Sequence, residues 1–432
     1  MNRYIVKCYI FLTIFTIVNS MTCKVNYGTK TIRDCINELT EKSEMIIQIS
    51  SNSNSYTECP GKVTLPNNVI LKIESQNLNQ MVTYDCTANN GNFIWISNEN
   101  SSSNIVIRGI NIIGNNLDTG SACIELNGSY RSNIFAMYNV TMQKCAGGAI
   151  KTTFYLFLRN CQFTNNKAQF GGAIHSDCLN IDGCVFQGNQ ATESGGAIYL
   201  PDDSGAFIIE NSEFRDNTAS VNGGAINSGY TDMYIANSKF INNSASIGGH
   251  LNTATLNTVQ IINSILLDGL AIQSGGGINF MESCKLVNFT GSTFKANVAE
   301  NIVGTINFDS ESHGRKTNVI SGVFYQDNYP FSNEFLKFTN SVQVLNLIDC
   351  PCNPISYNEY NQTFCLNVQG DCKNGYAQVN NQGIVTSCNC VSSNCNSHDF
   401  NDNSTIISKG SHHFKSLVFT FLTVTINIYL LN

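Results

Sequence analysis

Two short phrases recur along the middle of this chain of 432 residues, always in the same order. The first has the form F-x-x-N, and the second, which follows it, has the form G-G-A-I. Gly-Gly pairs begin at positions 147, 171, 195, 223, 248 and 275, so successive repeats lie 24, 24, 28, 25 and 27 residues apart. Self-similarity at such a period is typical of a solenoid, in which each repeat contacts only its neighbours. The repeat residues are Phe163, Asn166, Gly171, Gly172, Phe186, Asn189, Gly195, Gly196, Phe214, Asn217, Gly223, Gly224, Phe240, Asn243, Gly248, Gly249, Phe294 and Asn297.

Strands of alternating character precede the F-x-x-N phrases, as in residues 206–210 and 232–236. Alternation sends every second side chain inward, and equivalent residues of neighbouring coils stack about 4.8 Å apart. The density of Gly and the period of two exclude a helical bundle. We therefore predict an all-β protein in which residues 45–348 form a right-handed parallel β-helix, a pectin-lyase-like solenoid of roughly ten to twelve coils.

Columns of like side chains are predicted for the interior of this β-helix. The Phe residues of the repeats would form an aromatic ladder, with Met142 and Ile112 in the Phe position of earlier, partial copies. Each Asn would bond its own backbone or the equivalent Asn one coil away. A second inward column, two residues before each Phe position, contains small side chains. Its members are Cys161, Cys184, Ser212, Ser238, Ser264 and Ser292.

An amphipathic segment precedes what we expect to be the first strand, Met45–Ile49. Between residues 29 and 42, four apolar residues fall at helical spacing: Ile32, Cys35, Ile36 and Leu39. We expect a helix that lies across the open end of the core, because an uncovered terminal coil exposes apolar residues and unpaired strand edges. Residues 21–44 are thus assigned to an N-terminal cap.

The composition changes after residue 348. Seven cysteines fall within residues 349–398, which lack repeats and bulky apolar runs, so disulfides rather than a core would hold this part together. C-x-C pairs occur without any C-x-x-C, which favours disulfides over a zinc site. We interpret the segment as a small Cys-rich stalk.

Both ends resemble targeting signals. Residues 1–20 combine a basic start, an apolar run and a small-residue cleavage site, as in a secretory signal peptide. Residues 399–415 form a polar spacer before an apolar tail at 416–432, which is the layout of a glycosylphosphatidylinositol attachment signal with Asn403 as the candidate attachment residue. A single-pass transmembrane helix is the alternative. We expect a chain anchored at its C-terminus on the extracellular side of the plasma membrane.

Cysteine and Asn usage fit an oxidising, secretory route. Of 18 cysteines, 17 remain after removal of the signal peptide, far more than a cytosolic protein usually carries. This odd number leaves at least one cysteine unpaired within the chain. Candidate glycosylation sequons begin at Asn100, Asn127, Asn139, Asn242, Asn288, Asn361 and Asn403.

The charge balance limits the class of partner. A net charge of −7 and a pI near 5.4 provide no basic field, so nucleic acid is excluded as an expected partner. Only 13% of residues are charged, which suits β-rich surfaces of polar, uncharged side chains. The partner we expect is an extracellular glycan or protein, with the membrane contacted through the C-terminal anchor.

The linked F-x-x-N and G-G-A-I phrases, found over residues 135–330, are similar to the repeats of the chlamydial polymorphic outer membrane proteins, a family with similar surface proteins in eukaryotic microbes. The resemblance implies a β-helical passenger displayed outside the cell, with roles in adhesion and antigenic variation. This chain departs from the family after its repeats, where a Cys-rich segment and an apolar tail follow. The export mechanism of the bacterial members is therefore not expected here.

Enzymes that cleave polysaccharides by hydrolysis need two carboxylates that face one cleft. Asp202 and Asp203 are interpreted as a solvated turn, Asp216 as isolated, and residues 313–316 as a charged loop. His175 and His250 are expected at the surface beside Gly-Gly turns. We predict no catalytic residue, metal or cofactor, and a non-catalytic cell-surface protein for adhesion to glycans, proteins or neighbouring cells. The alternative is a polysaccharide-active β-helix enzyme, a lyase or hydrolase, whose carboxylates would converge on one face of adjacent coils.

Overall fold

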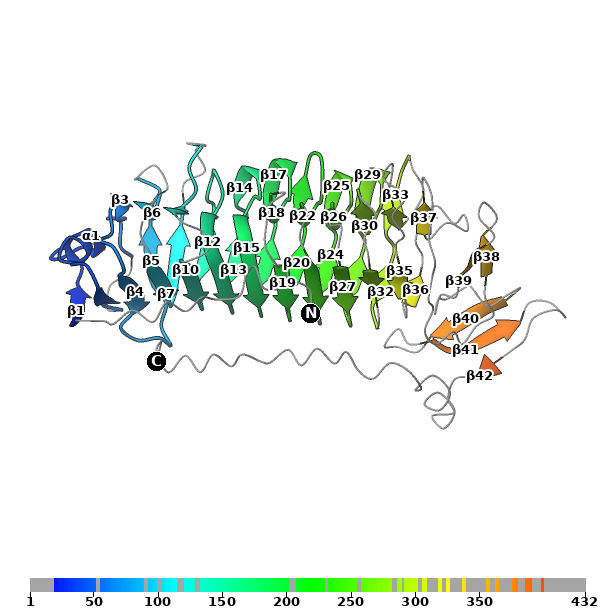
Figure 1. Ribbon diagram of the computed structural model, residues 1–432, viewed down its shortest axis with the longest axis horizontal. Helices are drawn as coiled ribbons and strands as arrows, with labels where there is room; N and C mark the ends of the chain where they lie inside the picture. The colour runs from blue at the N-terminus through cyan, green and yellow to red at the C-terminus, as the bar shows by residue number, and fades with distance from the viewer. Residues whose placement is uncertain are drawn as a thin grey trace.

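The computed structural model shows a chain wound into an elongated β-solenoid of about 10 turns (Figure 1). It describes residues 19–51, 55–88, 92–98, 103–114, 120–128, 133–201, 207–229, 232–254, 258–281, 286–289, 291–301 and 305–308, and the backbone of eight short strands between residues 318 and 399. Parallel strands form sheets of 21, 10 and 6 strands along the solenoid. The predicted parallel β-solenoid is thereby confirmed.

The large sheet has two rows of strands. Its first row contains β1 (Asn19–Val25), β2 (Ser43–Ile49), β4 (Ile70–Ser75), β7 (Asn104–Arg108), β10 (Ile134–Tyr138), β12 (Ile150–Arg159), β15 (Ile174–Asp182), β19 (Phe207–Glu210), β23 (Met233–Ala236), β27 (Thr258–Ile262), β31 (Leu286–Asn288) and β35 (Asn318–Ile320). Its second row contains β3 (Gly61–Val63), β6 (Ile94–Asn98), β9 (Ile124–Gly128), the first residues of β12 and β15, β18 (Ile198–Leu200), β22 (Ile226–Ser228), β26 (Leu251–Thr253), β30 (Ile278–Phe280), β34 (Ile306–Phe308) and β37 (Leu336–Phe338).

The two smaller parallel sheets complete each coil. The ten-stranded sheet contains β5 (Val82–Asp85), β8 (Ile110–Ile113), β11 (Thr141–Gln143), β13 (Gln162–Thr164), β16 (Val185–Gln187), β20 (Glu213–Arg215), β24 (Lys239–Ile241), β28 (Ile265–Leu267), β32 (Thr293–Lys295) and β36 (Phe324–Gln326). The six-stranded sheet contains β14 (Lys167–Phe170), β17 (Gln190–Ser194), β21 (Thr218–Ala219), β25 (Ser244–Ile247), β29 (Leu270–Ser274) and β33 (Val298–Ala299). Antiparallel strands follow: β38 (Ile355–Tyr357) with β39 (Gln362–Phe364), and β40 (Gly375–Val379), β41 (Val385–Cys390) and β42 (His398–Asp399).

The predicted aromatic ladder lies inside the ten-stranded sheet. Phe163, Phe186, Phe214 and Phe240 are fully buried and stack in register, with successive ring centres 4.9, 4.6 and 4.8 Å apart and rings within 6° of parallel. Parallel coils impose this arrangement, because residues at one register position repeat at the strand spacing. The predicted small-residue column lies beside the rings. From Cys161 to Ser264, each of its backbone N–H groups donates to the side chain one coil on, as Ser212 does to Ser238 (3.1 Å).

The Asn residues of the repeats form a second buried ladder. The side-chain amide of Asn166 donates to Asn189 (2.9 Å), that of Asn189 to Asn217 (3.0 Å), and that of Asn217 to Asn243 (2.9 Å). Each amide also bonds a backbone carbonyl, as Asn189 does with that of Phe163 (3.0 Å). Buried polar groups need such partners, so the ladder fixes the coil register from inside.

The two glycines of the repeat serve different purposes. Gly195 has φ +70°, a conformation that favours glycine. At Gly196, a Cβ atom would overlap the carbonyl oxygen of Gly224 in the next coil and lie 2.7 Å from the backbone of Thr218. In the other Gly-Gly pairs from 171 to 248, the first glycine likewise has a positive φ, and a Cβ on the second would likewise overlap a carbonyl oxygen of the next coil.

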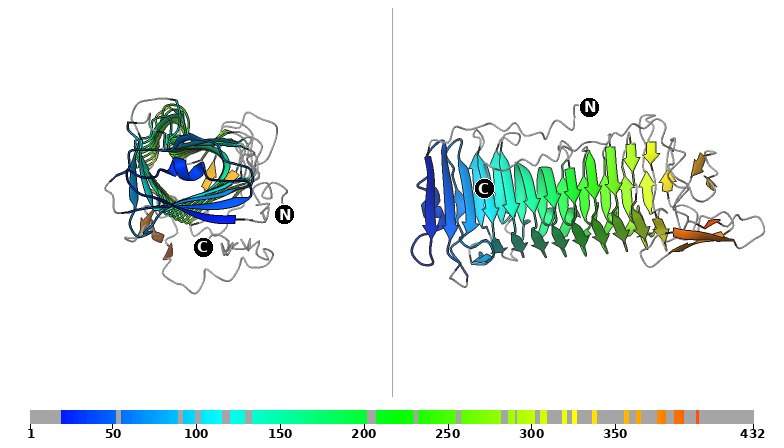
Figure 2. Two further views of the ribbon diagram at one scale, coloured as in Figure 1. Left: turned by 90° about the vertical axis from the view of Figure 1, so that its left-hand side faces the viewer. Right: turned by 90° about the horizontal axis from the view of Figure 1, so that it is seen from below.

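The N-terminal end differs from the sequence-based prediction. A helix is present, but α1 spans only Ile32–Ile36, with Thr31 as its N-cap. After Ile36, the backbone N–H groups of Glu38 and Leu39 bond carbonyls three residues earlier, which is the pattern of a 3₁₀ turn. The helix therefore ends within one further turn. The predicted inward residues are buried: Ile32, Cys35, Ile36 and Leu39. Viewed along the solenoid, α1 lies across the end of the coils (Figure 2).

The first strand of the solenoid was wrongly placed at Met45–Ile49. β1 precedes α1 and pairs in parallel with β2, from Asn19 beside Ser43 to Val25 beside Ile49. The reason is the alternation in residues 19–25, where Cys23 and Val25 are buried. Asn19 and Ser20, the last residues of the predicted signal peptide, begin this strand, whereas residues 1–18 lie outside the described residues.

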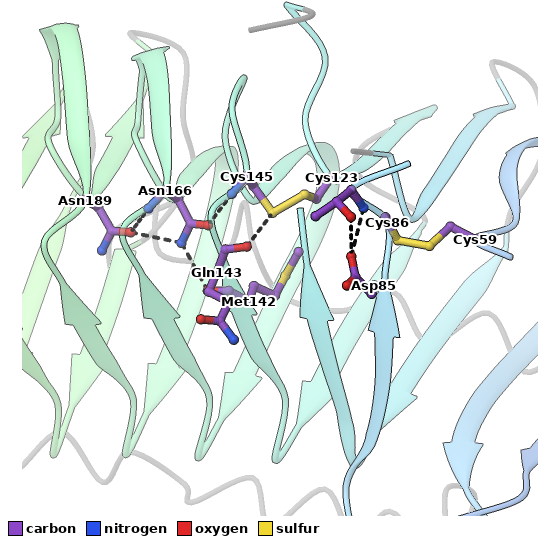
Figure 3. Close-up of a disulfide and its surroundings, with 10 residues drawn as sticks. Cys59, Asp85, Cys86, Cys123, Met142, Gln143, Cys145, Asn166 and Asn189 are labelled. Carbon is purple, nitrogen blue, oxygen red and sulfur yellow. Dashed lines mark hydrogen bonds between the residues drawn. A yellow bond between two sulfur atoms is a disulfide. The ribbon is translucent and has the colours of Figure 1, made fainter. Parts of the chain in front are cut away.

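The early coils carry disulfides, one of which lies in line with the Asn ladder. Cys59 pairs with Cys86, and Cys123 with Cys145. The backbone N–H of Cys145 donates to the Asn166 side chain (3.0 Å), so Cys145 occupies the position before the first Asn of the ladder (Figure 3). A third disulfide, Cys23–Cys35, attaches α1 to β1. Two buried cysteines, Cys161 and Cys184, are free thiols in the small-residue column.

Candidate recognition surface

One register position in the second row of the large sheet faces outward and carries unusually varied side chains. In successive coils it holds Lys62, Trp95, Glu125, Lys151, His175, Tyr199 and Asn227, each paired in register with the next. We call these seven residues the outer row. All are exposed or partly exposed, and parallel pairing holds them about one strand spacing, roughly 4.8 Å, apart.

An aromatic cluster lies where the outer row meets the six-stranded sheet. The ring centre of Tyr199 is 4.8 Å from that of Phe170, at the end of β14, and 5.0 Å from that of His175. The imidazole of His175 packs edge-to-face on the tyrosine ring. Two strands of one sheet and one of another therefore place three partly exposed rings side by side.

The charge state of this cluster is set by burial. Burial lowers the pKa of His175 to about 4, with a smaller contribution from the positive charge of Lys151. The imidazole is therefore neutral at pH 7 and presents one donor and one acceptor. A general base is most effective with a pKa near the working pH, so this histidine is better suited to hydrogen bonding than to proton transfer.

A second aromatic contact lies at the other end of the outer row. The ammonium of Lys62 sits 4.3 Å from the centre of the Trp95 ring, a cation–π distance. The indole N–H of Trp95 is buried and has no partner among the described residues. Together the two ends of the row offer ring faces, an ammonium and neutral polar groups, which are the groups that orient ligands in binding sites.

In the coils after Tyr199, the register position of the outer row holds asparagines whose side-chain amides bond one another. Asn307 donates to Asn279 (2.7 Å), Asn279 to Asn252 (2.8 Å) and Asn252 to Asn227 (2.7 Å). Asn252, Asn279 and Asn307 are buried and bonded to one another, so they stiffen the sheet rather than offer groups to a ligand. Sequence reasoning missed this second ladder, although an Asn follows Ile or Leu in each of these four repeats.

Two carboxylates meet in the first row of the large sheet. Asp182 and Glu210 occupy the same outward register position in adjacent coils. Asp182 forms an ion pair with Arg159 (3.3 Å) and accepts a bond from Asn211 (2.8 Å). Burial, and then the charge of Asp182, raise the pKa of Glu210. From the sequence we expected no carboxylates on one face of adjacent coils, and this expectation is wrong, because Asp182 and Glu210 are register neighbours.

His250 was predicted at the surface, and this is wrong. Its side chain is fully buried, with Nδ1 3.0 Å from the Asn243 amide nitrogen and Nε2 3.0 Å from the Asn297 side-chain oxygen. The intervening coil has Gly269 where the repeat places Asn, and the imidazole fills the vacant position in the ladder. Burial lowers its pKa to about 3.

The remaining candidate residues are dispersed. Asp216 is an exposed turn residue with φ +56° that accepts a bond from Asn242 (2.7 Å). Asp202, Asp203 and the 313–316 loop lie outside the described residues. Of the sequon residues, Asn139 and Asn242 are exposed, Asn127 and Asn288 are partly buried, and Asn100, Asn361 and Asn403 lie outside the described residues.

Metal and membrane features are limited to what the described residues contain. Within them no cluster of three His, Cys, Asp or Glu side chains is placed to hold a metal ion. None of the helices in the described part is long and apolar enough to cross a membrane. Most of the predicted Cys-rich stalk lies outside these residues, and so do the predicted spacer, from its second residue onward, and the tail, which together make up residues 400–432.

Comparison with known proteins identifies the repeats. Residues 160–177, 183–201 and 211–229 match the model of the Chlamydia polymorphic membrane protein (Chlamydia_PMP) repeat. These segments contain β13, β16 and β20 with their stacked Phe residues. No curated protein and no solved structure matches the chain.

Proposed function

Because the chain carries repeats of the polymorphic membrane protein family, we propose that it is a non-catalytic cell-surface protein that uses its solenoid for adhesion to, or recognition of, glycans, proteins or neighbouring cells. The outer row is the proposed contact surface. In this proposal the solenoid is right-handed, as parallel crossover connections nearly always are, and α1 is its N-terminal cap.

The observation that carries this proposal is the combination of a varied outer row with a uniform interior. Inward positions repeat Phe, Asn and Ser, whereas the outward position changes from Lys62 through Trp95 to Tyr199. The ladders hold these outward side chains at fixed spacing, so binding would lose little conformational entropy. Rigid aromatic and charged side chains of this kind dominate protein interfaces.

A pair of variants tests the outer row. The purified natural chain would be applied to a glycan array and to cultured cells, and so would the outer-row variant Lys151→Ser/Tyr199→Ser. The matched control is Lys239→Ser/Tyr234→Ser, which changes the same residue types outside the outer row, on β24 and β23. We expect the outer-row variant to lose about tenfold or more in binding, and the control to retain it. Equal binding by all three proteins, at unchanged thermal stability, would refute the outer row as the contact surface.

The enzyme alternative rests on Asp182 and Glu210. An aspartate that is ion-paired with Arg159, beside a glutamate of raised pKa, resembles the pairing of a nucleophile and a general acid in glycoside hydrolysis. Release of reducing ends from a polysaccharide panel would support this second function if Glu210→Gln abolished it. If the natural chain releases no reducing ends from any polysaccharide of the panel, this second function is ruled out.

Localisation is proposed from the ends of the chain together with its disulfides. We infer secretion through a signal peptide at residues 1–20 and attachment through the 399–432 segment, by lipid at Asn403 or by a helix, with the Cys-rich stalk between. Three disulfides in the described residues support an oxidising compartment. Glycosylation is proposed first at Asn139 and Asn242, whose side chains are exposed.

A further inference from the structure

The outer side of the six-stranded sheet carries two columns of outward side chains. Strands β14, β17, β25, β29 and β33 of this sheet lie along one long side of the rod (Figure 1). The second column, two residues further along each coil than the first, runs from Gln169 to Glu300. All side chains of both columns are exposed or partly exposed, and we call this surface the lateral face. The first column holds, in register, Lys167, Gln190, Thr218, Ser244, Leu270 and Val298.

One coil of the lateral face is apolar. Leu270 and Ile272 are outward residues of β29, and they are 42% and 51% exposed. Val298 of the next coil extends this patch, whereas the remaining positions of the two columns are mostly Thr, Ser and Gln. Single exposed apolar residues are common, but adjacent ones on a flat strand mark a contact surface.

The size of the lateral face limits the strength of the contact. Six strands about 4.8 Å apart, each with about five residues, cover roughly 25–30 Å by 15 Å, or about 400 Å². A standard protein interface buries about 800 Å² on each partner. A contact through this face alone is therefore weak and reversible.

Two charged residues complement a second copy of the same face. Lys167 begins β14, whereas Glu193 lies near the other end of the adjacent strand β17, and neither forms an ion pair with another described residue. Two sheets can pack face to face about a two-fold axis parallel to the rods. This operation reverses the strand direction and brings each coil onto the same coil of the other copy. Lys167 of each copy then lies diagonally opposite Glu193 of the other.

The same arrangement brings the apolar residues together. Leu270 of each copy faces Ile272 of the other, because β29 meets β29. With the rods antiparallel and fully overlapped, Leu270 would instead face the polar strand β17. Moving the rods until the two β29 strands met would leave half of the described face uncovered. Parallel rods also keep both C-terminal ends on one side, as two chains displayed on one cell require.

The candidate glycosylation sites leave the lateral face accessible. None of the described sequon residues belongs to the six strands. Asn242 lies in the turn before β25, and its side chain donates to Asp216 in the turn of the preceding coil (2.7 Å). A glycan on Asn242 would therefore begin at the edge of the face and not on it.

We propose that the lateral face binds a second copy of this chain in a parallel, side-by-side pair. Leu270 packs against Ile272 of the other copy, and Lys167 pairs with Glu193 of the other copy. Display of many chains on one surface raises their effective concentration, which offsets the small area. This self-association goes beyond the proposed function, because the outer row lies on other strands.

Sedimentation velocity of the full chain, from about 1 µM to about 1 mM, tests the self-association. We expect a monomer–dimer equilibrium with a dissociation constant on the order of 100 µM, weakened about tenfold or more in Leu270→Ser/Ile272→Ser. The matched control is Ile265→Ser. Ile265 lies in the same coil and is 38% exposed, but it belongs to β28 in the ten-stranded sheet, so this variant should dimerise as the natural chain does.

Charge reversal tests the parallel arrangement. Lys167→Glu and Glu193→Lys should each weaken the dimer about threefold or more, because like charges then meet across the interface. The double variant Lys167→Glu/Glu193→Lys should restore it. Since the two residues lie at opposite ends of adjacent strands in one chain, this restoration reports a contact between chains.

Several results would overturn the proposal. A chain that stays monomeric over the whole range would do so, as would a dimer that Leu270→Ser/Ile272→Ser leaves unchanged or that Ile265→Ser weakens equally. A double charge reversal that fails to restore the dimer would refute the parallel arrangement. Binding to phosphatidylcholine vesicles without any dimer, lost in Leu270→Ser/Ile272→Ser, would assign the face to a lipid surface. All these variants keep Lys151 and Tyr199, so ligand binding by the outer row succeeds or fails separately.

Discussion

At the scale of single residues, His250 shows how two departures from the repeat compensate each other. Gly269 removes one Asn from the inner ladder, and in the preceding coil His250 replaces the Ala of G-G-A-I. Both departures are visible in the sequence. The neighbouring Gly-Gly turn alone favours a surface position for His250, whereas the compensation depends on a contact between adjacent coils.

A double-mutant cycle tests this compensation. His250→Ala leaves the side chains of Asn243 and Asn297 facing a void, which should cost about 2–4 kcal/mol. Gly269→Asn alone should also destabilise, because a Cβ there would lie 2.7 Å from the imidazole and would overlap the Gly276 carbonyl oxygen. Denaturant unfolding of both singles and the double variant should show the double to be more stable than the sum predicts. Strict additivity would contradict the pairing.

The same histidine predicts a pH dependence of stability. Burial lowers its pKa to about 3 in the folded chain, against about 6.5 when unfolded. The free energy of unfolding is highest above pH 6.5 and falls as the pH drops towards 3. In this range His250 is protonated in the unfolded chain but stays neutral in the folded chain, so acid favours unfolding. The loss should be about 1.4 kcal/mol per pH unit below 6.5. His175, with a pKa near 4, adds a similar slope, so the His250 contribution is the difference from the His250→Ala/Gly269→Asn variant.

At the scale of the elements, inward columns could be predicted from sequence and outward ones could not. A solenoid repeats its core geometry in every coil, so the same residue type returns at a fixed spacing in the sequence. Phe186 stacks on Phe163 and Asn189 bonds Asn217 for this reason, and the spacing alone predicts both contacts. Outward residues meet solvent or a ligand and need not repeat, which is why Tyr199 carries no periodic signal. The first strand was missed because Asn19–Val25 lies where a signal peptide was expected to end.

The Cys123–Cys145 disulfide and the Asn ladder stabilise the same position of the coil by different means, so we expect that one can be exchanged for the other. In Cys123→Ala/Cys145→Asn, the new amide should donate to Asn166, whose oxygen already accepts from the backbone of residue 145. Loss of the cross-link should cost about 2–4 kcal/mol, partly recovered by the added hydrogen bond. Thermal unfolding should therefore rank this variant above Cys123→Ala/Cys145→Ala. The reverse order would show that the two columns are not equivalent.

At the scale of the whole molecule, the solenoid is an elongated rod with α1 at one end and the C-terminal strands following the other in sequence (Figures 1 and 2). The proposed contact surface, the outer row, runs along one side of such a rod. Contact with an extracellular ligand or a neighbouring cell requires that the chain reach the outside of its own cell. The proposed function therefore depends on display of the chain at the cell surface.

The most direct measurement is to express the intact chain in a eukaryotic cell, label Lys side chains with a membrane-impermeant reagent, and then treat the cells with phosphatidylinositol-specific phospholipase. We expect a labelled chain at the surface. Its release by the enzyme would indicate the lipid anchor, and its retention a spanning helix. If the chain stays unlabelled while an established surface protein in the same cells is labelled, the chain is not displayed at the surface and the proposed function is refuted.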